Sequence, residues 1–246
     1  NKQFLDRYHL NGYYHDLTYP RGYAVPTANT GWYDAKTKTW QKTYPVLATR
    51  ELYRRLYAIT KDADPNAFDI GHMSSRVWIP VLAYEDAYLD GETLLPSLIG
   101  KDNYMDALSM DQWRAEYTGR QWGPIPIMLP ELDAVHRVQE EPTRGLAALL
   151  LLHDTTVWPI WSNVSVLTKM REAKDAFGID TATFIPYFDE IPPATTDMKD
   201  VYISAYKKPD GKVLLVVGNT SNDARNGTVT INTKRLGIDV SNIISW

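Results

Sequence analysis

Short apolar, β-rich runs alternate with polar or helix-like stretches along the first two thirds of the chain. We count five such runs, and each leads into polar residues. They are Gly12–His15 before Asp16, Ala67–Ile70 before His72, Val77–Tyr84 before Glu85 and Asp86, Ile125–Leu129 before Glu131, and Leu146–Leu152 before His153 and Asp154. This alternation is typical of parallel α/β folds. It predicts a (β/α)-barrel, whose active site is built at the C-terminal ends of the strands.

Helical periodicity falls between these runs. The spacing of leucine and isoleucine predicts a helix over Val46–Thr60 with its apolar residues near one face. A second helix is expected over Ser109–Tyr117, with Ser109 as its N-cap. A third is expected over Val164–Ala176, ending before Gly178.

The character of the chain changes near residue 180, where several prolines end the helical pattern. Antiparallel strands are expected over Val201–Lys207, Lys212–Asn219 and Thr228–Asn232. We therefore predict an α/β barrel region over residues 1–180 and a small antiparallel β-sandwich over 181–246. Five strands are fewer than the eight of a (β/α)8 TIM barrel. Either the remaining strands lie outside this chain, or the architecture is not a barrel. We favour the first explanation and expect the chain to carry only the C-terminal strands of the barrel, with an N-terminal segment or a second chain completing it.

Composition removes several classes of function. The net charge is only −4, so no basic footprint for nucleic acid is expected. No apolar run approaches the ~20 residues of a membrane span. The absence of cysteine excludes disulfides, thiolate zinc sites and cysteine nucleophiles. The five histidines lack metal-ligand spacing, and neither GxSxG nor GxxxxGK[ST] occurs, so transition-metal, serine-hydrolase and P-loop sites are not expected.

Two carboxylates usually cleave a glycosidic bond, and this chain offers them at strand ends. Asp16 closes one run, and the segment Ala83–Glu92, AYEDAYLDGE, holds four acids beside two tyrosines. Crowded carboxylates raise one another's pKa, which keeps one protonated as an acid while another stays ionised. A solvated acidic loop, or a loop that binds calcium, is the alternative. No other cofactor or metal is expected.

Further polar and aromatic residues lie near the predicted strand ends. His72 is a candidate for binding a substrate hydroxyl, although a lone histidine is often structural. The pair His153 and Asp154 follows the most apolar run and precedes Trp158. The 8 Trp and 16 Tyr suit sugar platforms as well as ordinary interfaces, because each ring has an apolar face and a polar tip.

The order of these motifs resembles barrel glycoside hydrolases related to family 123. It is carried by GYYHD, RELYRRLY, GHMS, YEDAYLDGE, PIMLPEL and LLHD, over roughly residues 8–170, and the closing segment is similar to the small β-domains that follow glycosidase barrels. The resemblance implies a glycan hydrolase with Asp16, Asp86 and Glu92 as the leading carboxylates. The supporting residues that it implies are His72, Tyr84, Asp90, His153 and Asp154, and we add Glu85 and Trp158 as substrate-binding candidates.

One departure from the family pattern concerns its adjacent Asp-Glu pair, in which the Asp orients the N-acetyl group of the substrate and the Glu is the acid. Here the order is Glu85-Asp86, and an Asp-Glu pair occurs only at Asp189-Glu190, in the proline-rich connection.

The sequence thus predicts a glycoside hydrolase with a carbohydrate substrate. The alternative is a non-catalytic glycan-binding protein. The chain begins at Asn1 without a signal-peptide pattern; a secreted or periplasmic location is favoured.

Overall fold

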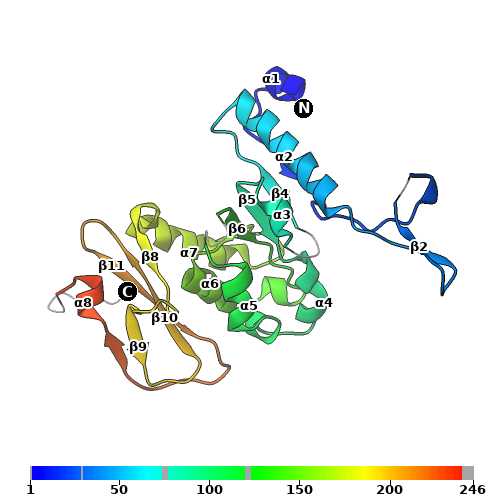
Figure 1. Cartoon of the computed structure of the whole chain (residues 1–246). Helices are drawn as coiled ribbons and strands as arrows, with labels where there is room; N and C mark the ends of the chain where they lie inside the picture. The colour runs from blue at the N-terminus through cyan, green and yellow to red at the C-terminus, as the bar shows by residue number, and fades with distance from the viewer. Residues whose placement is uncertain (1, 29, 74–76, 120–122, 240–246) are drawn as a thin grey trace. The chain divides into compact units, whose positions relative to one another are not determined.

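The structure is a computed structural model that describes residues 2–28, 30–73, 77–119 and 123–239. Its central feature is a five-stranded sheet with the order β1-β4-β5-β6-β7 (Figure 1). The strands are β1 (Tyr14–His15), β4 (Ile70–His72), β5 (Ala87–Asp90), β6 (Ile125–Met128) and β7 (Thr156–Val157). Strand β4 pairs in parallel with β1 on one side and with β5 on the other. The predicted α/β class with a parallel sheet is confirmed, while the closed barrel stays a prediction.

The chain divides into two compact units. The first contains Asn1–Thr93 and Arg120–Ile127, and the second contains Leu94–Gly119 and Met128–Trp246. Each unit is described below by itself. The predicted boundary at residue 180 stays a prediction.

Helices and a hairpin accompany strands β1, β4 and β5 in the first unit. They are α1 (Lys2–Tyr8), η1 (Pro26–Ala28), the hairpin of β2 (Trp32–Asp34) and β3 (Thr39–Gln41), α2 (Val46–Ala63), α3 (Ile79–Leu82) and η2 (Glu92–Leu94). The predicted helix over Val46–Thr60 is confirmed as α2. Its Leu47 and Leu52 are exposed, whereas Tyr53 and Thr60 are buried, so the face that α2 buries is not the one its leucines suggested.

The strand predicted over Val77–Tyr84 is wrong, because this stretch forms the short helix α3. Pro80 stands in the first turn of α3, where its missing N–H costs no hydrogen bond. The strand comes later, as β5, and all four of its residues are buried. The acidic segment is therefore built around a buried strand and not around a solvated loop.

The second unit holds most of the helices and the largest core. Its helical elements are α4 (Leu95–Leu98), η3 (Tyr104–Asp106), α5 (Met110–Glu116), η4 (His136–Val138), α6 (Glu140–His153), α7 (Val164–Phe177), η5 (Ile179–Thr181) and α8 (Thr233–Leu236). The core gathers leucines of α6 around Trp113, Tyr104 and Tyr117. None of the helices in the described ranges is both long and apolar enough to cross a membrane.

The strand predicted over Leu146–Leu152 is also wrong, because these residues belong to α6. A continuous apolar run suits a buried strand and a helix surrounded by protein equally well, and periodicity does not separate the two. Here α6 buries residues on several sides and packs against β10 and β11. The helix ends at Asp154, whose φ of 55° lies in the left-handed region.

The other two helix predictions are confirmed together with their ends. Helix α5 begins after Ser109, whose side chain accepts a hydrogen bond from the backbone N–H of Gln112 in a capping box. Helix α7 is followed by Gly178, which adopts a φ of 78° that favours glycine.

The C-terminal part forms two small antiparallel sheets. One has the order β11-β10-β8 and the other pairs β12 with β9. The strands are β8 (Thr183–Ile185), β9 (Ala194–Thr196), β10 (Val201–Lys207), β11 (Val213–Asn219) and β12 (Val229–Ile231). The three predicted strands are confirmed as β10, β11 and β12, whereas β8 and β9 were not predicted. A β-sandwich arrangement stays a prediction.

Candidate active site

His72 is the centre of a polar cluster at the C-terminal ends of β1, β4 and β5. Tyr14 of β1 pairs with Ile70 of β4, and His72 follows Ile70 by two residues. Because side chains two residues apart share a face of a strand, Tyr14 and His72 lie on the same side of the sheet. The Tyr14 hydroxyl is 2.5 Å from His72 Nδ1. The parallel pairing of β1 and β4 thus brings together residues that are far apart in sequence.

Two carboxylates face the two nitrogens of the His72 ring. Asp16 Oδ1 lies 3.2 Å from Nδ1, and Glu92 Oε2 lies 3.4 Å from Nε2. The His72 side chain is only 10% exposed, whereas those of Asp16 and Glu92 are 61% and 51% exposed. Because one ring lies between them, Asp16 Oδ1 and Glu92 Oε2 are no more than about 9 Å apart, which is below the upper limit of roughly 9.5 Å for paired carboxylates in glycoside hydrolases. We call Tyr14, Asp16, His72 and Glu92 the His72 cluster.

Tyr14 remains protonated in this cluster. Tyr14 is 46% exposed, and its partial burial, together with the negative charges of Asp16 and Glu92, raises its pKa to about 12. Its hydroxyl therefore remains a neutral hydrogen-bonding group at neutral pH. Tyr14 of β1 and Asp16, which follows β1, approach Nδ1 of the His72 ring, and Glu92 after β5 approaches Nε2.

The opposite face of the sheet holds a second, buried pair. His15 of β1 and Gly71 of β4 are register partners, and Glu85 Oε1 lies 3.0 Å from His15 Nδ1. Glu85 occupies the space left by the missing side chain of Gly71, where an added Cβ would lie 3.0 Å from Glu85 Cδ. Burial raises the pKa of Glu85, although His15 opposes the shift. Burial lowers the pKa of His15, but the hydrogen bond and charge of Glu85 outweigh this, so it is raised overall.

Asp86 lies at the other end of β5 from Glu92. The four residues of β5 separate the two, and a strand rises about 3.3 Å per residue. Asp86 accepts hydrogen bonds from Lys61 Nζ at 2.9 Å and from the backbone N–H of Asp69 at 2.9 Å. These contacts place its carboxylate with α2 and with the residue before β4, and not with the His72 ring.

Tyr84 and Asp90 are also held by local contacts. The hydroxyl of Tyr84 accepts a hydrogen bond from Arg50 of α2 at 2.8 Å. Asp90 is buried at the end of β5, and its Oδ1 accepts a hydrogen bond from the backbone N–H of Gly91 at 2.9 Å. Of the residues predicted in the first unit, the structure therefore brings Asp16, His72 and Glu92 together.

The predicted residues of the second unit have different environments. His153 has no exposed surface; its Nδ1 lies 2.8 Å from the carbonyl oxygen of Leu149, and its Nε2 lies 3.2 Å from the Tyr187 hydroxyl. Burial lowers the pKa of His153 to about 4, so the ring is neutral at neutral pH. Asp154 ends α6, and Trp158 follows β7 with part of its ring exposed. His153 thus packs in the core, whereas Trp158 has a surface that a sugar could contact.

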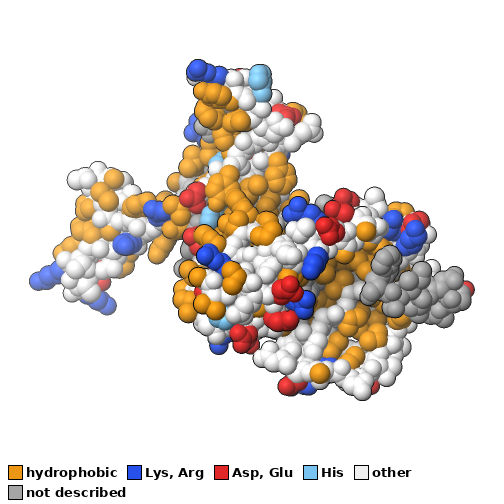
Figure 2. All heavy atoms as spheres, turned by 180° about the vertical axis from the view of Figure 1, so that it is seen from behind, with side chains coloured by type: hydrophobic (Ala, Val, Ile, Leu, Met, Phe, Trp, Pro, Cys, Tyr) orange, Lys and Arg blue, Asp and Glu red, His pale blue; other side chains and the backbone are white. Residues whose placement is uncertain are grey.

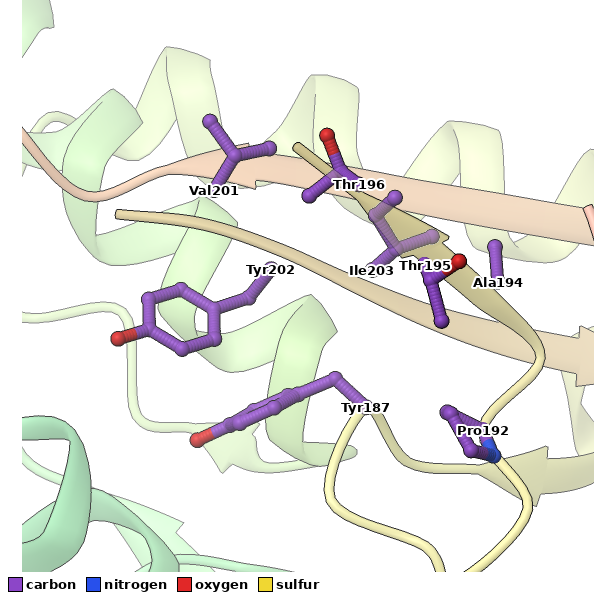
Figure 3. A pocket seen from close by; sticks show the side chains of 8 residues that line it. All are labelled: Tyr187, Pro192, Ala194, Thr195, Thr196, Val201, Tyr202 and Ile203. Atoms are coloured by element: carbon purple, nitrogen blue, oxygen red, sulfur yellow. The ribbon is translucent and has the colours of Figure 1, made fainter. Parts of the chain in front are cut away.

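A pocket of about 240 Å³ also lies in the second unit (Figure 3). Tyr187 and Tyr202 form one wall with ring centroids 4.8 Å apart. The remaining lining residues are Pro192, Ala194, Thr195, Thr196, Val201 and Ile203. No carboxylate lines this pocket, and none of the predicted site residues does.

Three further findings concern the site. In the described part of the chain, no group of three or more histidine or acidic side chains is arranged to hold a metal ion. Tyr14, which the sequence offered as a neighbour of Asp16 able to supply stacking and hydrogen bonds, places its hydroxyl on His72. The pairing of His15 with Glu85 had no signal in the sequence, because it joins residues 70 positions apart.

Comparison with known families bears on the C-terminal part of the chain. Residues 154–244 match the family model of the glycoside hydrolase 123 C-terminal domain. This match supports a relation to glycoside hydrolase family 123. It agrees with the resemblance of the closing segment, and it includes neither Asp16, His72 nor Glu92. No curated protein and no solved structure matches the chain.

Proposed function

We propose that this protein is a glycoside hydrolase that cleaves a poly- or oligosaccharide with Asp16 and Glu92. The observation that carries the proposal is the position of both carboxylates on one imidazole ring, at the C-terminal ends of parallel strands. This edge of a parallel α/β sheet is where such enzymes place their chemistry. The match of residues 154–244 to a glycoside hydrolase domain supports the same class of reaction.

The proposed reaction divides the two carboxyl groups by role. One, in its protonated form, gives its proton to the oxygen of the leaving sugar, while the other, ionised, attacks the anomeric carbon or activates a water molecule. Both side chains are more than half exposed, so a glycan can reach them from solvent. Asp86 is not given a role in the reaction, because Lys61 already pairs with it.

His72 and Tyr14 are proposed as positioning residues. In this proposal the nearly buried His72 ring orients the two carboxylates that lie beside its nitrogens, and the Tyr14 hydroxyl orients the ring. Trp158 remains a proposed substrate contact, and a further segment or second chain is proposed to complete the barrel.

Neither of the two adjacent acidic pairs, Glu85-Asp86 and Asp189-Glu190, supplies the reacting carboxylates in this proposal. Glu85 is buried against His15, and Asp86 is bound by Lys61. In the other pair, Asp189 is bound by Arg235 at 2.9 Å. The substrate-assisted mechanism of the family is therefore not proposed for this chain.

Replacement of each carboxylate tests the proposal. We expect Asp16→Asn and Glu92→Gln each to lower kcat by about 10²–10⁴-fold, because each removes a proton donor or base without changing the size of the side chain. Release of reducing sugar from a panel of polysaccharides and nitrophenyl glycosides measures this. Glu190→Gln is the matched control, since Glu190 is an exposed acid outside the cluster, and should keep wild-type activity.

Unchanged activity in both cluster variants, with the fold preserved by circular dichroism, would remove the site. Retention of glycan binding by a wild-type protein that hydrolyses no member of the panel would instead favour a non-catalytic glycan-binding protein.

A further inference from the structure

The connection between β1 and α2 contains an extended arm, which we define as residues 21–45. It includes η1 and the hairpin of β2 and β3, and Tyr23 and Thr43 extend the pairing with an isolated bridge. Figure 1 shows the arm projecting from the N-terminal end of α2. Among its described residues, 21–28 and 30–45, none is buried. The arm therefore has no core of its own.

Large aromatic side chains cover this arm. Trp32 and Tyr33 are each 52% exposed, and Trp40 is 46% exposed. Tyr33 and Trp40 are opposite each other across the hairpin, so they share one face, and their ring centroids are 6.0 Å apart. A two-stranded hairpin is marginally stable alone in water, and large exposed apolar patches on soluble proteins serve as contact surfaces for ligands or partners.

The arm is also basic. It carries Arg21, Lys36, Lys38 and Lys42, while its one acid is Asp34. Asp34 is engaged in the hairpin turn, where its carboxylate accepts hydrogen bonds from the Lys36 N–H and the Thr37 hydroxyl. The whole chain has a net charge of −4, so the arm stands out from an acidic molecule. Figure 2 shows its hydrophobic and basic side chains together.

The place of the arm in the chain connects it with the His72 cluster. Asp16 stands directly after β1, and the arm begins five residues later in the same connection. The connections that leave the C-terminal ends of parallel strands are those that bind substrate in α/β enzymes. The arm and the His72 cluster also belong to the same compact unit.

We propose that the arm binds an acidic glycan, a saccharide chain that bears carboxylate or sulfate groups, and holds it for cleavage at the His72 cluster. This inference rests on the proposed function and adds the class of substrate to it. The apolar C–H face of a sugar ring packs on the face formed by Tyr33 and Trp40. The lysines pair with the acidic groups of the glycan, and because these contacts are exposed, binding weakens as salt is added.

Affinity electrophoresis in native gels tests binding separately from hydrolysis. The Asp16→Asn protein is run through gels that contain polygalacturonate, chondroitin sulfate or the neutral polysaccharide dextran. We expect the acidic polysaccharides to retard it, dextran to leave it unretarded, and salt to reduce the retardation. Replacement of Tyr33 and Trp40 together by alanine, or of Lys36, Lys38 and Lys42 together by glutamine, should weaken binding at least tenfold.

Matched controls lie outside the arm. Tyr8→Ala removes an equally exposed tyrosine of α1, and Lys199→Gln removes an exposed lysine of the second unit. Both should bind the acidic polysaccharides as the parent does. Equal retardation of the arm variants and the parent would overturn the inference, and so would equal retardation by dextran.

Two further outcomes separate the causes of failure. If acidic glycans bind through the arm but the wild-type protein cleaves none of the panel, the proposed function fails and the binding site stands. If a short glycoside is cleaved but the arm binds no polysaccharide, this inference fails alone. Sedimentation that shows a dimer lost in the Tyr33 and Trp40 variant, without glycan binding, would make the arm a contact between two copies and also overturn it.

Discussion

His153 and His72 show how the surroundings of a residue decide its chemistry. His153 has no exposed surface, stacks on Trp113 and contacts the Tyr187 hydroxyl. His72 is also nearly buried, but two solvent-facing carboxylates lie beside its nitrogens. Both follow or end an apolar run in the sequence. Only His72 lies beside carboxylates that a substrate could reach from solvent.

His153 should make the protein sensitive to acid. Burial lowers its pKa from 6.5 to about 4, so the unfolded state binds a proton that the folded state does not. The stability that the folded state gains from a neutral His153 is fully present above about pH 6.5 and is lost as the pH falls toward 4. We expect this group alone to lower the free energy of unfolding by about 2–3 kcal/mol between pH 7 and pH 4.

Urea unfolding of the wild type and of His153→Gln at pH 7, 5.5 and 4 measures this effect. The difference in the free energy of unfolding between the wild type and His153→Gln should shrink as the pH falls. The exposed His9, replaced in the same way, is the control. A difference between wild type and His153→Gln that does not change with pH would contradict the prediction.

Local signals fix the helices of this protein more firmly than its strands. Ser109 and Gln112 close a reciprocal capping box at the start of α5, and Gly178 takes the left-handed conformation after α7. These contacts join residues that are close in sequence, so they do not depend on which distant segments pack against the helix. The strands of the central sheet have only two to four residues, so their identity depends on the partner strands beside them.

Ser109→Ala should lower the free energy of unfolding by about 1 kcal/mol, because it leaves the backbone N–H of Gln112 without its cap. Chemical denaturation at pH 7 measures the change. Ser165→Ala is the matched control, since Ser165 is exposed within α7 and its position is not a cap. Equal losses in the two variants would show that the capping box does not stabilise α5.

At the scale of the whole molecule, apolar burial differs between the two units. The second unit contains the large core of α6 and its neighbours, whereas the first unit carries the arm, in which no described residue is buried. Segments with few buried contacts open most readily. Within the described residues, the arm is thus a segment that few buried contacts hold in place.

Limited proteolysis should reflect this difference. Trypsin is expected to cut first after Lys36, Lys38 or Lys42, because an exposed hairpin without a core opens at little cost. Lys169 is also exposed but lies inside α7, and cleavage there should come later. Mass spectrometry of early digests identifies the order. First cleavage at Lys169 would contradict the expectation, and protection of the arm by chondroitin sulfate would agree with glycan binding.

The sequence by itself determined the features that depend on near neighbours. Periodicity and caps located α2, α5 and α7, and alternation with turn residues located β10 and β11. It also placed Asp16 and His72 at strand ends, because an apolar run followed by polar residues is a local pattern. These predictions needed no knowledge of which segments pack together.

The tertiary structure decided what depends on distant partners. Leu146–Leu152 lies in a helix that packs against β10 and β11, and the apolar run alone did not distinguish this helix from a buried strand. Of the predicted acids, Asp16 and Glu92 meet at His72 while Asp86 is bound by Lys61. Strand register made that selection, since a parallel pairing places side chains more than fifty residues apart within hydrogen-bonding distance.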